Sequence, residues 1–241
     1  MSFEMTFNGQ TLPIKVKSVG GRGIVEIEAI TGSIPGTDGS YYIRKRMPDK
    51  PMPVEFSIFP SSLEDAREKV DFLNSILTVG KVVPVIYSDE PDMTYYAYLS
   101  GQPDWDEGFY KINGTLPLIR KPYKYGNEMI IDSIDGNINV NNNGLINKNF
   151  NVQVVFNDSV NEYKIIKQST GEFVRVIYNF VATDILEIDF TKRKILINGI
   201  VQMPTLDIAS SWFFLDRGNN TIVIDDPLTS ESDLTYRPRF A

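Results

Sequence analysis

Two carboxylates on one expected strand are the first candidates for chemistry. Glu187 and Asp189 stand two residues apart, and such residues share a face of a strand at about 6.6–6.8 Å. The carboxylates of a glycoside hydrolase flank the scissile bond at about 5–9.5 Å, so the spacing permits that reaction. Leu186 and Ile188 would then fill the inner face. Because any amphipathic strand has a polar outer face, the pattern favours a solvated strand over a catalytic pair.

Trp105 stands within the acidic segment 104–107, where it could help to bind a sugar or a cation. Aromatic faces stack on pyranose rings, and carboxylates bind hydroxyl groups or Ca²⁺. Gly101, Pro103 and Gly108 surround the segment, and they favour a solvated turn between two strands. We therefore expect a turn here, with Trp105 covering the edge of the core.

Trp212 begins a second aromatic group, Trp212-Phe213-Phe214. Alternate residues of a strand face opposite ways. If Phe213 packs in the core, Trp212 and Phe214 form an outer platform that could contact a glycan. The reverse assignment buries both of them.

The composition removes most catalytic mechanisms. The 241 residues include no cysteine and no histidine, which excludes cysteine nucleophiles, thiolate zinc sites and the commonest general base near neutral pH. We expect neither enzymatic activity nor a cofactor or metal.

The net charge of −7, or −2 over residues 1–126 and −5 over residues 127–241, disfavours binding to nucleic acid. No apolar run reaches about 18 residues, so no membrane span is expected.

Residues 41–47 form the best candidate for a functional surface. They include Tyr41, Tyr42, Arg44, Arg46 and Met47, which are residue types enriched in interface cores. On an exposed hairpin such side chains would be sticky unless a partner covered them. The alternative is a surface hairpin with a basic tip that touches nothing.

Tyr123 and Tyr125 lie in a second candidate segment, residues 118–125. This segment is either a linker between domains or a packing seam between subunits.

The elements that position these groups begin with a strand over residues 53–59. After it, apolar residues at alternating spacings of three and four predict a helix over residues 63–77 with Ser61 or Ser62 as its cap. Its expected apolar stripe is Leu63, Ala66, Val70, Leu73 and Leu77. Period-2 alternation and turn signals predict further strands at residues 11–18, 24–30, 82–87, 94–99 and 109–119.

The rest of the chain indicates a second domain at residues 135–241, after a linker at residues 127–134. Asn198-Gly199 predicts a tight hairpin because both positions tolerate positive φ. Short strands at regular spacing indicate a β-sandwich or jelly roll. They are expected at residues 136–140, 153–156, 163–168, 172–178, 185–189, 194–197, 212–215, 221–224 and 233–238.

The order of several pieces resembles the distal tail proteins of long-tailed phages that infect Gram-positive bacteria. Those pieces are Phe7-Asn8-Gly9, the hairpin Gly36-Thr-Asp-Gly39 with its tyrosines, the strand and lone helix, the turn at residues 88–92 and the exit Lys121-Pro-Tyr-Lys-Tyr-Gly126. The resemblance covers nearly the whole chain. It implies a mainly β protein, with a split-barrel-like N-terminal domain at residues 1–126 and a galectin-like, carbohydrate-binding-module-like C-terminal sandwich.

The resemblance also implies a role. Such a protein is a baseplate hub in the virion, made in the host cytoplasm, and its N-terminal domains form a hexameric ring, with two rings possible back to back. The partners implied are further copies of itself, the tail tube protein, the tail-tip protein or tail-associated lysin, and receptor-binding proteins. Genomic DNA passes through the ring without specific binding.

A carbohydrate-binding module of a cell-surface-recognition protein is the alternative. No basic stretch followed by an apolar segment begins the sequence, so a secretory signal is not expected. Galectin sugar sites use a histidine, and this chain has none. The resemblance to galectins therefore concerns the shape of the domain, and glycan binding by Trp212 or Trp105 is in doubt.

Overall fold

A computed structural model describes residues 2–108, 110–147, 149–225 and 230–241. The chain divides into two compact units, Met1–Tyr125 with Ala241, and Gly126–Phe240. The mainly β fold class is confirmed: the sheets are antiparallel, and in the described residues none closes into a barrel. The expected linker at residues 127–134 contains strand β11 (Met129–Asp132), which pairs with β20 (Ser230–Tyr236), so this stretch is part of a sheet.

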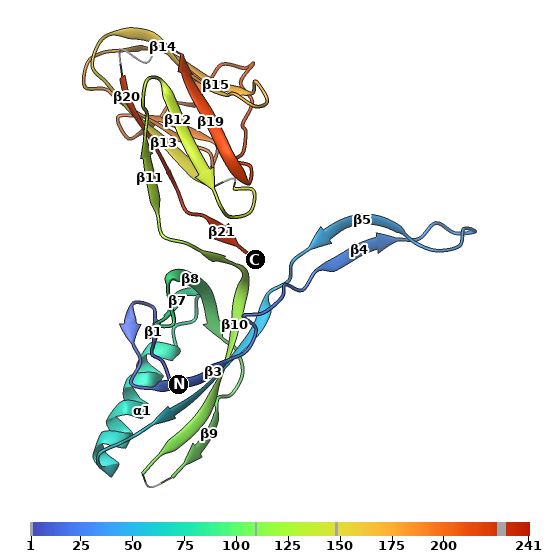
Figure 1. Cartoon of the computed structure of the whole chain (residues 1–241), viewed down its shortest axis with the longest axis vertical. Helices are drawn as coiled ribbons and strands as arrows, with labels where there is room; N and C mark the ends of the chain where they lie inside the picture. Colours follow the sequence, from blue (N-terminus) through green and yellow to red (C-terminus); the bar gives the residue numbers. More distant parts are fainter. Residues whose placement is uncertain (1, 109, 148, 226–229) are drawn as a thin grey trace. The chain divides into compact units, whose positions relative to one another are not determined.

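The first unit is built on an antiparallel sheet with the strand order β2-β1-β7-β8-β10-β6-β3, and β9 pairs with β10 off this path (Figure 1). Its strands are β1 (Met5–Phe7), β2 (Gln10–Thr11), β3 (Lys15–Val19), β6 (Lys50–Ile58), β7 (Val83–Tyr87), β8 (Glu90–Leu99), β9 (Asp104–Glu107) and β10 (Ile112–Tyr125). Met52, Val54 and Phe56 of β6 are buried, while Pro53 and Glu55 between them are exposed. The period-2 alternation therefore places one face of this strand in the core.

Helix α1 (Leu63–Leu77) confirms the expected helix. Ser62 is its N-cap, and the Ser62 hydroxyl accepts a hydrogen bond from the backbone N–H of Asp65 at 3.1 Å. Ala66, Leu73 and Leu77 are buried against the sheet core. Leu63 was expected in this stripe but is 55% exposed. It is the first residue of the helix, and the buried face begins at Ala66.

Two expectations around β10 were wrong. Residues 104–107 are not a solvated turn but strand β9, in which Trp105 lies opposite Gly114 and Asp104 opposite Thr115. For residues 118–125 a linker and a packing seam between subunits were both open, and the linker alternative is wrong, because β10 continues through them and pairs again with β8 at Lys124 and Tyr125. The expected strand start at residue 109 lies outside the described residues.

Between β3 and β6 the chain forms a separate two-stranded sheet of β4 (Glu28–Gly32) and β5 (Tyr41–Arg46), visible as a hairpin in Figure 1. We call residues 28–46 the arm. The expected strand at residues 24–30 thus begins later, at Glu28. Gly36 and Gly39 have φ values of +85° and +86°, which glycine adopts easily in the turn at the tip.

The second unit contains two sheets. One has the order β11-β20-β13-β16-β17-β18 and the other β12-β19-β14-β15. Their remaining bounds are β12 (Asn137–Asn142), β13 (Phe150–Phe156), β14 (Val160–Lys167), β15 (Phe173–Phe180), β16 (Ile185–Asp189), β17 (Lys194–Ile197), β18 (Ile200–Val201) and β19 (Gly218–Asp225). A 3₁₀-helix, η1 (Met203–Thr205), follows β18, and β21 (Arg239–Phe240) follows β20.

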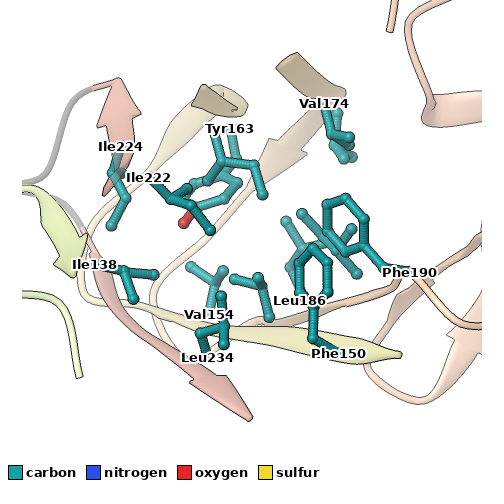
Figure 2. Close-up of a cluster of buried hydrophobic side chains, with 14 of the residues drawn as sticks. Ile138, Phe150, Val154, Tyr163, Val174, Leu186, Phe190, Ile222, Ile224 and Leu234 are labelled. Carbon is teal, nitrogen blue, oxygen red and sulfur yellow. The ribbon is translucent and has the colours of Figure 1, made fainter. Parts of the chain in front are cut away.

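Aromatic and aliphatic side chains from both sheets fill the core of the second unit (Figure 2). Phe150 stacks on Phe190 with ring centroids 4.0 Å apart, and the Tyr163 hydroxyl lies 2.9 Å from the Ser232 hydroxyl. Asn198 and Gly199 both have positive φ and form the expected hairpin between β17 and β18. The expected strand at residues 212–215 is wrong, because only Leu215 forms a bridge, with Asn147.

The alternation in β6 gives a stability prediction. Phe56→Ala removes a fully buried ring and should lower the free energy of unfolding by about 3–5 kcal/mol. Glu55→Ala, one residue earlier on the exposed face, should change it by less than about 0.5 kcal/mol. Urea unfolding of the whole chain measures both, and equal losses would contradict the register of β6.

Candidate subunit interface

The arm is a ribbon without a core of its own. All six residues of β5 are exposed, and the exposed fractions of Tyr41, Tyr42 and Ile43 are 52%, 61% and 52%. An isolated two-stranded hairpin is at best marginally stable in water. Large apolar side chains gathered on such a ribbon indicate a surface that a partner covers.

The two faces of β5 differ in composition. The pairing register places Tyr41, Arg44 and Arg46 on one face and Tyr42 and Lys45 on the other, because a bulge at Ile43 shifts the alternation. The Tyr41 ring lies over Gly32 on β4, where a Cβ atom would come within 2.6 Å of the ring. Arg46 makes one long ion pair, 3.7 Å, with Glu28 across the ribbon. Each face therefore combines aromatic or aliphatic surface with positive charge.

Arg22 fixes the chain where it leaves β3 toward the arm. Its guanidinium donates two hydrogen bonds to the carboxylate of Asp89, at 2.8 and 3.0 Å, and a third to Glu90 at 3.2 Å. It also lies 4.6 Å from the ring centroid of Tyr87. This geometry joins a bidentate ion pair to a cation–π contact.

Glu90 extends this cluster. It accepts a hydrogen bond from the Tyr95 hydroxyl at 2.6 Å and pairs with Lys124. Burial alone would raise the pKa of Glu90, but the bonds from Lys124 and Tyr95 outweigh it and lower that pKa. The hydrogen bond from Arg22 lowers the pKa of Asp89. Both carboxylates are thus held in their charged form.

Arg120 binds the chain next to Arg22 from inside the first unit. It is only 2% exposed, and its Nε donates to the carbonyl of Gly21 at 3.0 Å, next to Arg22. Burial lowers the pKa of Arg120, although arginine remains charged in proteins. On the segment that returns from the arm to β6, Asp49 pairs with Lys121 of β10 at 2.8 Å. We call Arg22, Asp89, Glu90 and Arg120 the arm root.

The structure divides the expected interface residues into two sets. Tyr41, Tyr42, Arg44 and Arg46 lie together on β5, followed by half-buried Met47. Tyr123 and Tyr125 lie on β10 and are half-buried, with the Tyr125 ring 5.5 Å from that of Tyr96. The second set therefore belongs to the sheet of the first unit and not to the arm.

The two tryptophans are packed against aromatic neighbours. Trp105 is 36% exposed, and its ring centroid lies 6.0 Å from that of Phe56. Trp212 is half-buried beside Phe190, with ring centroids 5.1 Å apart. Phe213 is buried, as the outer-platform arrangement requires. Trp212 covers the core edge-on, and its contact with a glycan stays a prediction.

The carboxylates of β16 lie as the solvated-strand interpretation expects. Leu186 and Ile188 are buried, and Glu187 between them is exposed. Asp189 accepts a hydrogen bond from the backbone N–H of Lys192 at 2.8 Å, which is a turn contact. In the described parts of the chain, no group of three or more acidic residues is placed to hold a metal ion.

Sequence reasoning missed the arm root. Arg120 offered one signal, because it follows Leu116 and Leu118 at the period of the buried face. A charged residue in that position must find polar partners inside the protein. The partners of Arg22 carried no comparable signal. No helix among the described residues is long and apolar enough to span a membrane.

Comparison with known proteins defines the class. Residues 8–119 match the family "phage tail protein RIFT-related domain", and residues 143–240 match the family "siphovirus-type tail component, C-terminal domain". Two such domains in this order mark a structural component of a siphophage tail.

The relatives identify the family. The chain is 32% identical to the distal tail protein of Bacillus phage SPP1, over 99% of this chain and 96% of the relative. The crystal structure of that SPP1 protein, described as a paradigm of the hub adsorption apparatus in phages infecting Gram-positive bacteria, matches with a TM-score of 0.82 at 27% identity over 99% of both chains. A chain of the phage p2 baseplate shares the fold, with a TM-score of 0.50 and 10% identity over 98% of this chain and 97% of that one. The protein belongs to the distal tail protein family of siphophages, as its resemblance predicted.

The arm root gives a pH-dependent prediction. Because the pKa values of Asp89 and Glu90 are lowered in the folded protein, their contribution is complete above the ordinary values of 3.8 and 4.5 and is lost as pH falls below them. Arg22→Gln should lower the melting temperature by several degrees at pH 7, and the difference should narrow at pH 3. Calorimetry at the two pH values measures it.

Lys15→Gln is the matched control, since the Lys15–Glu4 pair is about half exposed on both sides and such pairs contribute little. An equal loss for Arg22→Gln at both pH values would show that the carboxylates are not its effective partners.

Proposed function

We propose that this protein forms a hexameric ring that joins the tail tube to the tail tip and docks receptor-binding proteins. The observation that carries the proposal is the exposed arm, a ribbon with tyrosine, isoleucine and arginine on its surface and no core beneath them. Membership of the distal tail protein family supports it, because a tail hub must bind copies of itself and other tail proteins.

The physical reason is the cost of an exposed ribbon. Side chains such as Tyr42 and Arg44 are residue types whose burial at an interface centre contributes most to binding. A neighbouring subunit that covers the arm removes its apolar surface from water and orders the ribbon at the same time. Repeating one such contact around an axis produces a closed ring.

In this function the chain carries no catalytic step and needs no cofactor. The ring lets genomic DNA pass without binding it, which a net charge of −2 over residues 1–126 permits, because attraction to phosphate requires excess positive charge. Its remaining surfaces meet the tail tube protein and the tail-tip protein or tail-associated lysin, while the second unit docks receptor-binding proteins. The carbohydrate-binding alternative has less support, because Trp212 is half-buried and packs edge-on against Phe190.

Light scattering with size-exclusion chromatography tests the ring. The wild-type chain should elute at six times 27.3 kDa, or at twice that mass for back-to-back rings. Deletion of residues 36–47, which removes β5, should leave monomers. Tyr42→Ala should raise the subunit dissociation constant by about 30-fold, the equivalent of a 2 kcal/mol anchor.

Ile208→Ala is the matched control, because Ile208 is fully exposed in the second unit and should leave the mass unchanged. The ring proposal is wrong if the wild-type chain stays monomeric at high concentration and also in the presence of tail tube protein. The arm is not the contact if its deletion leaves the oligomer intact.

A further inference from the structure

Two edge strands of the first unit carry opposite charge. Strand β5 has three cationic residues, Arg44, Lys45 and Arg46, and no acidic one. Strand β9 has three acidic residues, Asp104, Asp106 and Glu107, and no basic one. The acidic segment lies on an edge of the main sheet, and the basic segment lies on the exposed arm.

Both strands leave one edge unpaired within the described residues. There β5 pairs with β4, and β9 pairs with β10 alone. An unpaired strand edge presents a row of backbone N–H and C=O groups that can take up a further strand. Addition of a strand to such an edge is a common mode of recognition.

A shallow hollow adjoins β9. Trp105 of β9 and Ala66, Arg67, Val70 and Asp71 of α1 line it, and its volume is about 300 Å³. The exposed part of the Trp105 ring gives this hollow an apolar wall. Such a surface suits an aromatic side chain such as Tyr42, which the register of β5 places on the face opposite Arg44 and Arg46.

The two strands lie at opposite ends of β10. Trp105 pairs with Gly114, while Lys50, where the chain returns from the arm, pairs with Arg120. Six residues separate these positions, which is about 20 Å along a strand. Since the arm leaves from the far end of β10, β5 is exposed and does not cover β9 of its own chain. A contact between β5 and β9 therefore involves two copies.

Charge also selects this pairing over the symmetric ones. Two β5 strands side by side would bring six positive charges together, and two β9 strands would bring together the four carboxylates of their Asp104 and Asp106 residues. Like charges opposite each other on neighbouring strands destabilise pairing, whereas opposite charges stabilise it. The charges therefore disfavour a symmetric dimer and favour a head-to-tail contact.

We infer that β5 of one copy docks along the free edge of β9 in the next copy, with its apolar side chains against the hollow beside Trp105. The inference rests on the proposed ring and names its second surface. It assigns Asp104 and Asp106 as the partners of Arg44 and Arg46.

Charge exchange tests the contact. Arg44→Glu/Arg46→Glu and Asp104→Lys/Asp106→Lys should each raise the subunit dissociation constant at least about tenfold, and the chain with all four changes should recover most of the wild-type affinity. All four side chains are exposed, so the folds should be unaffected. Glu231→Lys, an exposed acid of the second unit, is the control that should leave assembly unchanged.

Crosslinking gives a readout that does not depend on charge. Because the chain has no cysteine, Ile43→Cys with Asp106→Cys introduces one thiol on each strand. A short bifunctional thiol reagent should produce a ladder of covalent multiples of 27.3 kDa. Ile43→Cys with Glu231→Cys should produce none.

The outcomes separate the two proposals. Recovery of affinity together with the specific ladder supports docking of β5 on β9. If deletion of the arm abolishes the ring but the β9 changes do not, and the ladder is absent, the ring stands and the β9 contact is wrong. If the wild-type chain never assembles, even with tail tube protein, both are wrong.

Discussion

The feature on which the rest depends is a positive charge held between two tyrosine rings and two carboxylates. Arg22 and Arg120 join the loop before the arm to β8 and β10, so the arm begins from a fixed point of the sheet. A coreless ribbon contributes little stability of its own. Its direction is therefore set by these buried and half-buried cations, and any surface that receives the arm must match the direction they impose.

The two units do not share this constraint. Each has its own buried cluster: β-strands and one helix enclose the first, and two facing sheets enclose the second. A change in the second core, such as the stacked pair Phe150 and Phe190, acts on a different set of contacts from the arm root. Independent cores allow the outer surface of the second unit to vary without altering the buried contacts of the first unit.

Local signals were sufficient for α1, for β16 and β17, and for the Asn198-Gly199 hairpin, because capping, periodicity and turn preference act over a few residues. The exposure of Tyr41 and Tyr42 was also predictable from composition. Strand β9 was not, since its flanking glycines and proline indicate a turn and only pairing with β10 makes it a strand. The arm root was missed because Arg22 and Asp89 are 67 residues apart in sequence, and Gly21 and Arg120 are 99 apart.

The arm root affects the number of subunits in an assembly that is built through the arm. In a head-to-tail assembly the number of subunits is decided by one rotation angle, repeated at every contact, and a rotation that does not close produces an open helical filament instead. Arg120 donates a hydrogen bond directly to the backbone carbonyl of Gly21. A slight change in the direction of the arm at this point would therefore be repeated at every contact between subunits. The difference between a six-membered annulus and an endless fibre would then depend on the inclination of one hairpin.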